Sequence, residues 1–128
     1  MSNLEIDVLC GKIIGACIEV HKTLGPGLFE RIYHQCLCRE LTLRGIAYHD
    51  EFHISLNYKG LELDSVLRAD LLVEDTVIVE LKAVNEWNHI FEAQLISYLR
   101  LANKPAGLLI NFNVPILKDG IKRLFNGQ

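Results

Sequence analysis

Three charged residues stand inside two strongly apolar stretches near the middle of the chain. Asp70 lies in the stretch 68–73, and Glu80 and Lys82 lie in the stretch 77–83. Because an unpaired charge is costly to bury, such residues need partners or a bound ion. Two carboxylates supply the oxygen ligands that Mg²⁺ or Mn²⁺ prefers, and either ion can polarise a phosphodiester and acidify water. The pattern predicts a metal-dependent phosphodiesterase in which Lys82 orients the attacking water or stabilises charge on phosphorus.

The turn between these two stretches decides whether the acids can share a site. A two-residue turn at 74–75 would pair Asp70 with Val79, and the two carboxylates would point to opposite faces of the sheet. A three-residue loop over 74–76 would pair Asp70 directly with Glu80, and a β-bulge would also serve. We predict one of the latter two arrangements.

The elements that position these residues follow from the spacing of apolar side chains. Helical spacing predicts helices over about 4–24, 28–44, 89–103 and 117–125, and alternating or continuous apolar runs predict strands over about 46–58, 62–73, 76–83 and 106–112. The first three strands are expected to form an antiparallel meander, and the last should pair parallel through the helical crossover. The order predicts an α/β domain over 1–128 with a mixed sheet flanked by helices.

Composition excludes several classes of protein. The formal net charge of −3 over 128 residues argues against a strong nucleic-acid binder that works by counterion release, although a local groove can still be basic. No apolar run is long enough to span a membrane, and the N-terminus lacks the features of a signal peptide, so we expect a cytoplasmic protein. The cysteines lack Cys-x-x-Cys spacing and are expected to be free thiols; they are Cys10, Cys17, Cys36 and Cys38. Cys17 and His21 are four residues apart and could ligate zinc, but two ligands without a second pair are a weak signal.

Two further pairs of polar residues have helical spacing. Glu30 and Tyr33 are three apart, and Gln94 and Tyr98 are four apart, so each pair shares a helix face. Spacing alone favours ordinary roles for the first pair: Glu30 as a first-turn carboxylate stabilised by the helix dipole, and Tyr33 as a half-buried aromatic with its hydroxyl at the surface.

Taken together, these motifs resemble the GxxExxY family, a branch of the PD-(D/E)XK nuclease-like superfamily. The resemblance covers nearly the whole chain and implies a restriction-endonuclease-like αβββαβ core with extra N-terminal and C-terminal helices. The segments that carry it are Ile14–His21, Leu24–Leu28 with Glu30 and Tyr33, Arg68–Val73, Val79–Ala83, Glu92–Arg100 and Leu108–Phe112.

The resemblance also implies a role for each candidate residue. Asp70 and Glu80 match the metal-binding acids, Lys82 matches the catalytic lysine, and Glu30 looks like the extra helix carboxylate that completes the metal site. Gln94 and Tyr98 look like a glutamine–tyrosine motif beside the substrate, with Tyr33 as a further substrate-binding candidate. The chain departs from the family pattern in one place, since Phe91 stands where a histidine is common and His89 lies two positions earlier.

The expected function is a Mg²⁺- or Mn²⁺-dependent nuclease, with DNA favoured as substrate over RNA. One alternative is a non-catalytic regulatory module on the same fold that binds nucleic acid or protein. Another is a purely structural ion-pair network of the acids with Arg68 and Lys82. Because the chain is small and acidic, a second copy of it or a partner subunit would supply the missing binding groove.

Overall fold

The computed structural model describes residues 1–127, with Ser65 described by its backbone alone. The strands form one five-stranded sheet in the order β1-β2-β3-β4-β5, in which β3 and β4 are parallel and the other neighbours are antiparallel. Helix α3 connects the two parallel strands, so the predicted α/β class and its helical crossover are confirmed. The elements are α1 (Asn3–Leu24), α2 (Glu30–Leu43), β1 (Tyr48–Tyr58), β2 (Leu61–Val73), β3 (Val77–Lys82), α3 (Ile90–Ala102), β4 (Ala106–Asn111), the 3₁₀ turn η1 (Leu117–Gly120) and β5 (Ile121–Phe125).

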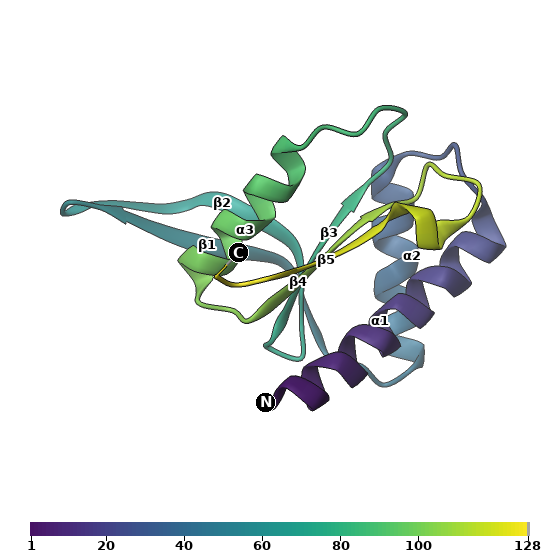
Figure 1. Cartoon of the computed structure of the whole chain (residues 1–128), viewed down its shortest axis with the longest axis horizontal. Coiled ribbons are helices and arrows are strands. Elements are labelled where there is room, and N and C mark those ends of the chain that lie inside the picture. The colour runs from purple at the N-terminus through teal and green to yellow at the C-terminus, as the bar shows by residue number, and fades with distance from the viewer. Residues whose placement is uncertain (128) are drawn as a thin grey trace.

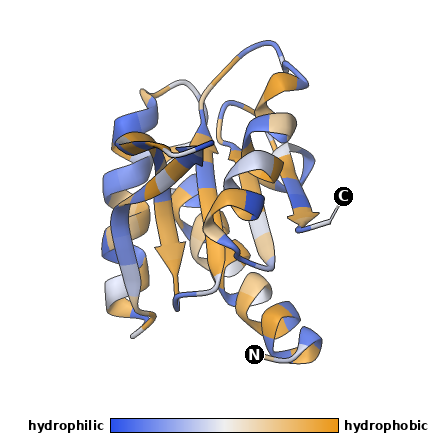
Figure 2. Ribbon diagram, turned by 90° about the vertical axis from the view of Figure 1, so that its left-hand side faces the viewer, coloured by the Kyte–Doolittle hydropathy of each residue, from blue (hydrophilic) through white to orange (hydrophobic). Residues whose placement is uncertain are grey.

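The sheet separates two apolar cores. One core joins α1 and α2 to one face of the sheet, and the other joins α3 to the opposite face. In Figure 1 the paired helices α1 and α2 lie at the right and α3 lies in front at the left, while the far end of the β1–β2 hairpin extends away from both. Figure 2 shows the strands at the centre as the most hydrophobic part of the chain. Among residues 1–127, no helix is long and apolar enough to cross a membrane.

The C-terminal segment corrects one prediction. Instead of a helix over 117–125, the chain makes a single 3₁₀ turn and then the edge strand β5, which pairs with β4. Strand β4 is buried throughout, so its backbone groups need a pairing partner on this side. Neighbouring basic residues of β5 point to opposite faces: Lys122 reaches Glu92 on α3 and Arg123 reaches Asp7 on α1. Strand pairing therefore outweighs the helical spacing of the basic residues.

Two glycines provide a matched test of packing. A Cβ at Gly120 would lie 2.3 Å from the backbone oxygen of Asn111, whereas a Cβ at Gly11 would meet nothing within 4 Å. We expect Gly120→Ala to destabilise the protein by about 1–3 kcal/mol or more, because the backbone must shift. Gly11→Ala in the middle of α1 should stabilise it by about 0.5–1 kcal/mol. Urea unfolding measures both changes, and a neutral Gly120→Ala would contradict the close approach.

Candidate metal centre

The loop between β2 and β3 brings the two predicted acids together. It has three residues, Glu74–Thr76, and its first two residues adopt φ values of 50° and 54°. The register pairs Leu71 with Val79, which sets Asp70 opposite Glu80. The three-residue alternative is therefore the one the chain adopts, and the two-residue hairpin is excluded.

Side-chain hydrogen bonds replace the backbone ladder where the two acids meet. The Asp70 N–H donates to Glu80 Oε1 at 2.8 Å, and the Leu81 N–H donates to Asp70 Oδ2 at 2.8 Å. Each strand thus binds the carboxylate of the other, and each carboxylate is fixed through one of its oxygens. A buried carboxylate that accepts a backbone N–H has a defined orientation, which a metal ligand requires.

Strand β2 changes its packing face at Asp70. Residues two apart on a regular strand share a face. Here Leu71 packs in the core with α1 and α2, whereas Ala69 packs in the core with α3, although both neighbour Asp70. Opposite this point on β1, Glu51 has a φ of 54°. At this break Asp70 Oδ1 lies 3.9 Å from Nδ1 of His34, a residue of α2.

Burial dominates the electrostatics of the two acids. Glu80 is only 6% exposed, and burial, with the charge of Asp70 adding to it, raises the pKa of Glu80 to about 8. Burial also raises the pKa of Asp70, against the Leu81 N–H and the charges of His34 and Lys82. Two negative charges are therefore unfavourable in this space without a cation, which is the environment that favours a divalent metal ion.

Glu30 and Lys82 complete the group. Glu30 begins α2, and partial burial and then the charge of Asp70 raise its pKa, so the third carboxylate lies close to the other two. The charge of Lys82 lowers the pKa of all three carboxyls, so its ammonium group lies within electrostatic reach of each of them. The Lys82 Nζ lies 4.4 Å from the centre of the Phe91 ring. Asp70 and Glu80 thus meet directly, and Glu30 and Lys82 lie within electrostatic reach of them.

Helix α3 supplies the predicted glutamine–tyrosine pair. Tyr98 is 7% exposed, and burial, followed by the charges of Glu80 and Asp70, raises the pKa of its hydroxyl. Its hydroxyl therefore lies within electrostatic reach of the carboxylates. Gln94 lies one helical turn earlier and is exposed, so it is accessible to a bound substrate.

Tyr33 is not brought to the surface of this site. Its side chain has no exposed area, and its ring stacks on Phe112 with centroids 4.5 Å apart. The hydroxyl donates to the oxygen of Gly25 at 2.6 Å and accepts from the N–H of Leu28 at 3.1 Å. A buried side chain cannot contact a substrate in this structure, and it is not half-buried as spacing alone suggested. Tyr33 instead closes the turn between α1 and α2 through its hydroxyl.

The role of Tyr33 can be tested by removing its hydroxyl. Tyr33→Phe leaves the oxygen of Gly25 and the N–H of Leu28 without this partner, and should cost about 1–3 kcal/mol of unfolding free energy. Tyr48→Phe is the matched control, because the Tyr48 hydroxyl makes an exposed contact with Thr42 at 3.2 Å. Urea unfolding gives both values. Equal losses in the two variants would contradict a buried closure by Tyr33.

Two polar neighbours of the acids, His34 and Asp50, were not predicted from the sequence. The Nε2 of His34 lies 2.6 Å from Oδ1 of Asp50 on β1. Cys38 contributes most to raising the pKa of His34, burial opposes the rise, and Asp50 and Asp70 add to it, so that the pKa is about 9. His34 is four residues after Glu30 on α2, so helical spacing could have identified it. No sequence signal pointed to Asp50.

Two other expectations find no support in the geometry. The guanidinium group of Arg68 lies 3.6 Å from the carboxylate of Glu51 and is therefore paired away from Asp70 and Glu80. Of the two cations in the proposed structural ion-pair network, only Lys82 remains as a partner for these acids. Cys17 is fully buried with a raised thiol pKa because of that burial, and the Nε2 of His21 lies 2.8 Å from the oxygen of Val114. All four cysteines are free thiols, as predicted.

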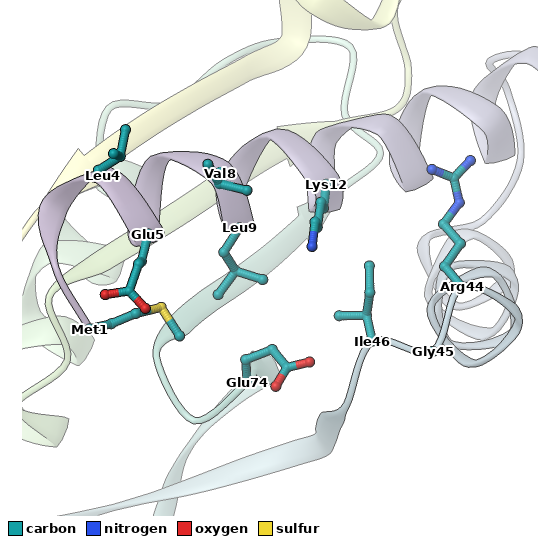
Figure 3. Close-up of a pocket in the computed structure, with 10 residues that line it drawn as sticks. All are labelled: Met1, Leu4, Glu5, Val8, Leu9, Lys12, Arg44, Gly45, Ile46 and Glu74. Carbon is teal, nitrogen blue, oxygen red and sulfur yellow. The ribbon is translucent and has the colours of Figure 1, made fainter.

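A pocket of about 670 Å³ lies apart from these acids. Figure 3 shows it between the first turns of α1 and the segment that follows α2, with Glu74 at its edge. Its lining contains none of the carboxylates that meet at the β2–β3 junction. This pocket is therefore not the place where the charged residues converge.

Solved structures share part of this fold. The crystal structure of SSO0001 superposes with a TM-score of 0.52 at 22% identity, over 73% of this chain and 47% of that chain. LHK-Exo, an alkaline exonuclease from Laribacter hongkongensis, gives a TM-score of 0.44 at 17% identity over 70% of this chain and 52% of its own, and its complex with dAMP gives 0.47 at 17% over 70% and 51%. The chain thus spans about half the length of these structures. A search of curated proteins gives no match.

A match to a protein family covers more of the chain than the solved structures do. The family model described as the PD-(D/E)XK nuclease superfamily matches residues 7–124, which include both acids of the β2–β3 junction, the lysine beside them and the glutamine and tyrosine of α3. The chain belongs to the PD-(D/E)XK nuclease superfamily.

Proposed function

We propose that this protein is a divalent-metal-dependent nuclease that hydrolyses phosphodiester bonds in nucleic acid, with DNA as its substrate. The observation that carries the proposal is the opposition of Asp70 and Glu80 across β2 and β3, with Lys82 beside them. Within the superfamily, we assign the chain to the GxxExxY family on the motifs described above. We place its activity in the cytoplasm, where the four cysteines would stay reduced.

The donor set fits a hard divalent cation. Asp70, Glu80 and Glu30 offer only carboxylate oxygens, which suit Mg²⁺ or Mn²⁺ with water at the remaining positions. The raised pKa values of all three carboxyls show that the surroundings disfavour their combined charge. Such an ion would activate water and stabilise negative charge at the phosphorus centre.

The other residues would bind and orient the substrate. Lys82 would hold the attacking water or a phosphoryl oxygen through its ammonium group, which the Phe91 ring positions from one side. Tyr98 and Gln94 would contact the nucleic acid from α3. Since the net charge is −3, a second copy or a partner subunit would provide most of the backbone-binding surface.

Metal binding should depend on pH through Glu80. With a pKa of about 8, this carboxyl holds a proton over most of the neutral range, and the metal must displace it. We expect the affinity for Mn²⁺ to rise by up to about tenfold per pH unit below pH 8 and to level off above it. Titration calorimetry at pH 6.5 and 8.5 in buffers of different ionisation enthalpy would measure the affinity and the proton release. An affinity that does not change over this range would contradict the raised pKa.

The central test is cleavage by the purified full chain. Labelled single-stranded and double-stranded DNA is incubated with Mn²⁺ or Mg²⁺, with and without EDTA, and RNA is assayed in parallel. We expect cleavage of DNA that requires the metal. If only RNA is cut, the substrate assignment is wrong and the nuclease assignment stands. A folded protein that binds Mn²⁺ but cleaves neither would favour the regulatory binding module.

A further inference from the structure

A second group of metal-ligating side chains lies between α2 and β1. One ligand atom from each of His34, Cys38 and Asp50 lies within 4.8 Å of the other two. The group shares no residue with the three carboxylates described above, and it combines nitrogen, sulfur and oxygen donors. We propose that His34, Cys38 and Asp50 form a second metal site, which takes Zn²⁺ or a similar borderline transition-metal ion.

The local structure explains why these side chains converge. His34 and Cys38 are four apart on α2 and therefore share a face of the helix. Asp50 is paired with Leu71, which packs in the core with α1 and α2, so Asp50 lies on the sheet face that α2 covers. The 2.6 Å contact between His34 and Asp50 shows that the helix and the strand already meet through these side chains.

The spacing of the group is close to that of a tetrahedral zinc site. Zinc bonds of about 2.0–2.3 Å place neighbouring ligand atoms roughly 3.3–3.6 Å apart. The contact of 2.6 Å would lengthen and the widest separation, at most 4.8 Å, would shorten, each by about 1 Å. Rotation of the half-exposed Asp50 side chain, which is 55% accessible, can lengthen its contact with His34 without moving the backbone. Three protein ligands would leave the fourth position to water.

The donor types distinguish this site from the neighbouring one. Thiolate and imidazole favour Zn²⁺, whereas the three carboxylates favour Mg²⁺ or Mn²⁺. The two sites can therefore hold different metals.

His34 would link the two sites. When Nε2 binds a metal, Nδ1 carries the ring proton, and Nδ1 faces Asp70 Oδ1 at 3.9 Å. A carboxylate beyond a metal-bound histidine commonly fixes the orientation of the ring. Zinc would thus join α2 to β1 and hold the imidazole that faces a ligand of the carboxylate site. The proposal does not depend on nuclease activity, since zinc binding is read without nucleic acid.

Cobalt provides a direct probe of the sulfur ligand. The full chain is stripped of metal, kept reduced, saturated with Mg²⁺ and titrated with Co²⁺. We expect one equivalent to produce a thiolate-to-cobalt charge-transfer band together with intense visible bands of four-coordinate Co²⁺, and Zn²⁺ should remove both. Cys38→Ser should lose the charge-transfer band. Cys36→Ser is the matched control, because Cys36 is a half-buried thiol on the same helix that lies outside the group, and it should keep the band.

Two more variants separate the sites and guard against misfolding. Asp50→Asn keeps the thiol and should weaken Co²⁺ binding by about tenfold or more, while Glu80→Gln alters the carboxylate site and should leave the band unchanged. Circular dichroism confirms that each variant is folded. The proposal is overturned if folded wild type gives no charge-transfer band, if the band survives Cys38→Ser, or if Glu80→Gln removes it.

Discussion

Glu80→Gln is expected to stabilise the metal-free protein and at the same time to remove metal-dependent cleavage. Glu80 is almost fully buried beside Asp70, and its pKa in the folded protein is about 8. Glutamine is uncharged and can still accept the hydrogen bond from the Asp70 N–H. The variant therefore keeps the interlocked strands but loses a metal ligand. Its affinity for Mn²⁺ should fall more than about 100-fold, because mutating even a residue that only contacts a metal ligand typically lowers metal affinity by about 10- to 100-fold.

The stabilisation has a defined dependence on pH. Below the ordinary glutamic acid pKa of 4.5, Glu80 is protonated in both the folded and the unfolded chain, so its ionisation contributes nothing. Between pH 4.5 and about 8 the unfolded chain loses this proton while the folded chain keeps it, so wild type becomes less stable as the pH rises. The difference of 2.5 units at pH 7 corresponds to about 3 kcal/mol. Glu80→Gln should be more stable than wild type by about that amount at pH 7.

Urea unfolding without metal at pH 4, 7 and 8.5 measures this effect. Glu86→Gln is the matched control, because Glu86 is an exposed acid in the loop before α3. It should change the unfolding free energy by less than about 0.5 kcal/mol at every pH. Added Mn²⁺ should stabilise wild type and leave Glu80→Gln almost unaffected. Equal stability of wild type and Glu80→Gln at pH 7 and 8.5 would show that Glu80 ionises normally in the fold.

Lys82→Ala is expected to lower kcat by about 10² to 10³-fold, the usual cost of removing a group that stabilises charge in a transition state. Lys82 lies at the end of β3 within electrostatic reach of all three carboxyls. Its loss removes the cation that would hold the water or the phosphoryl oxygen and leaves the metal ligands in place. Binding of Mn²⁺ should therefore change much less than the rate. Single-turnover cleavage of labelled DNA, with Mn²⁺ affinity measured separately, tests both statements.

Lys118→Ala serves as the control for this variant. Lys118 is exposed on the 3₁₀ turn before β5, and its removal changes the net charge equally. It should keep cleavage within about twofold of wild type, because surface changes away from a site have small effects. Cleavage by Lys82→Ala at the wild-type rate would mean that the activity comes from a contaminant or that the lysine has only a structural role.

Much of the site could be predicted because strand geometry is strict. The side-chain period of two left a small choice of loop lengths between β2 and β3, and only some of them place Asp70 and Glu80 on one face. The same rule did not show that β2 changes its packing face at Asp70. That break coincides with the φ of 54° at Glu51 in the partner strand and with a change in the helices that cover the hairpin, and neither is a local property of the β2 sequence.

The missed features depend on contacts between distant segments. Asp50 meets His34 only because β1 folds against α2, and a lone aspartate in a strand gives no sign of this contact. The segment 117–125 carries basic residues at helical spacing, yet β4 needs a partner at its edge, and this need decides the outcome. The family motif suggests that Tyr33 binds substrate, but its hydroxyl forms hydrogen bonds with the backbone of Gly25 and Leu28, between α1 and α2.

The three residues of the loop Glu74–Thr76 have a consequence for how this protein can change during evolution. None of them is among the proposed metal ligands, and their identities can vary wherever the turn geometry allows. Their number cannot, because one residue more or less would shift the pairing of Asp70 and turn its carboxylate away from Glu80. Among active relatives, substitutions in this loop should therefore be common, whereas single-residue insertions and deletions should occur only together with a compensating bulge.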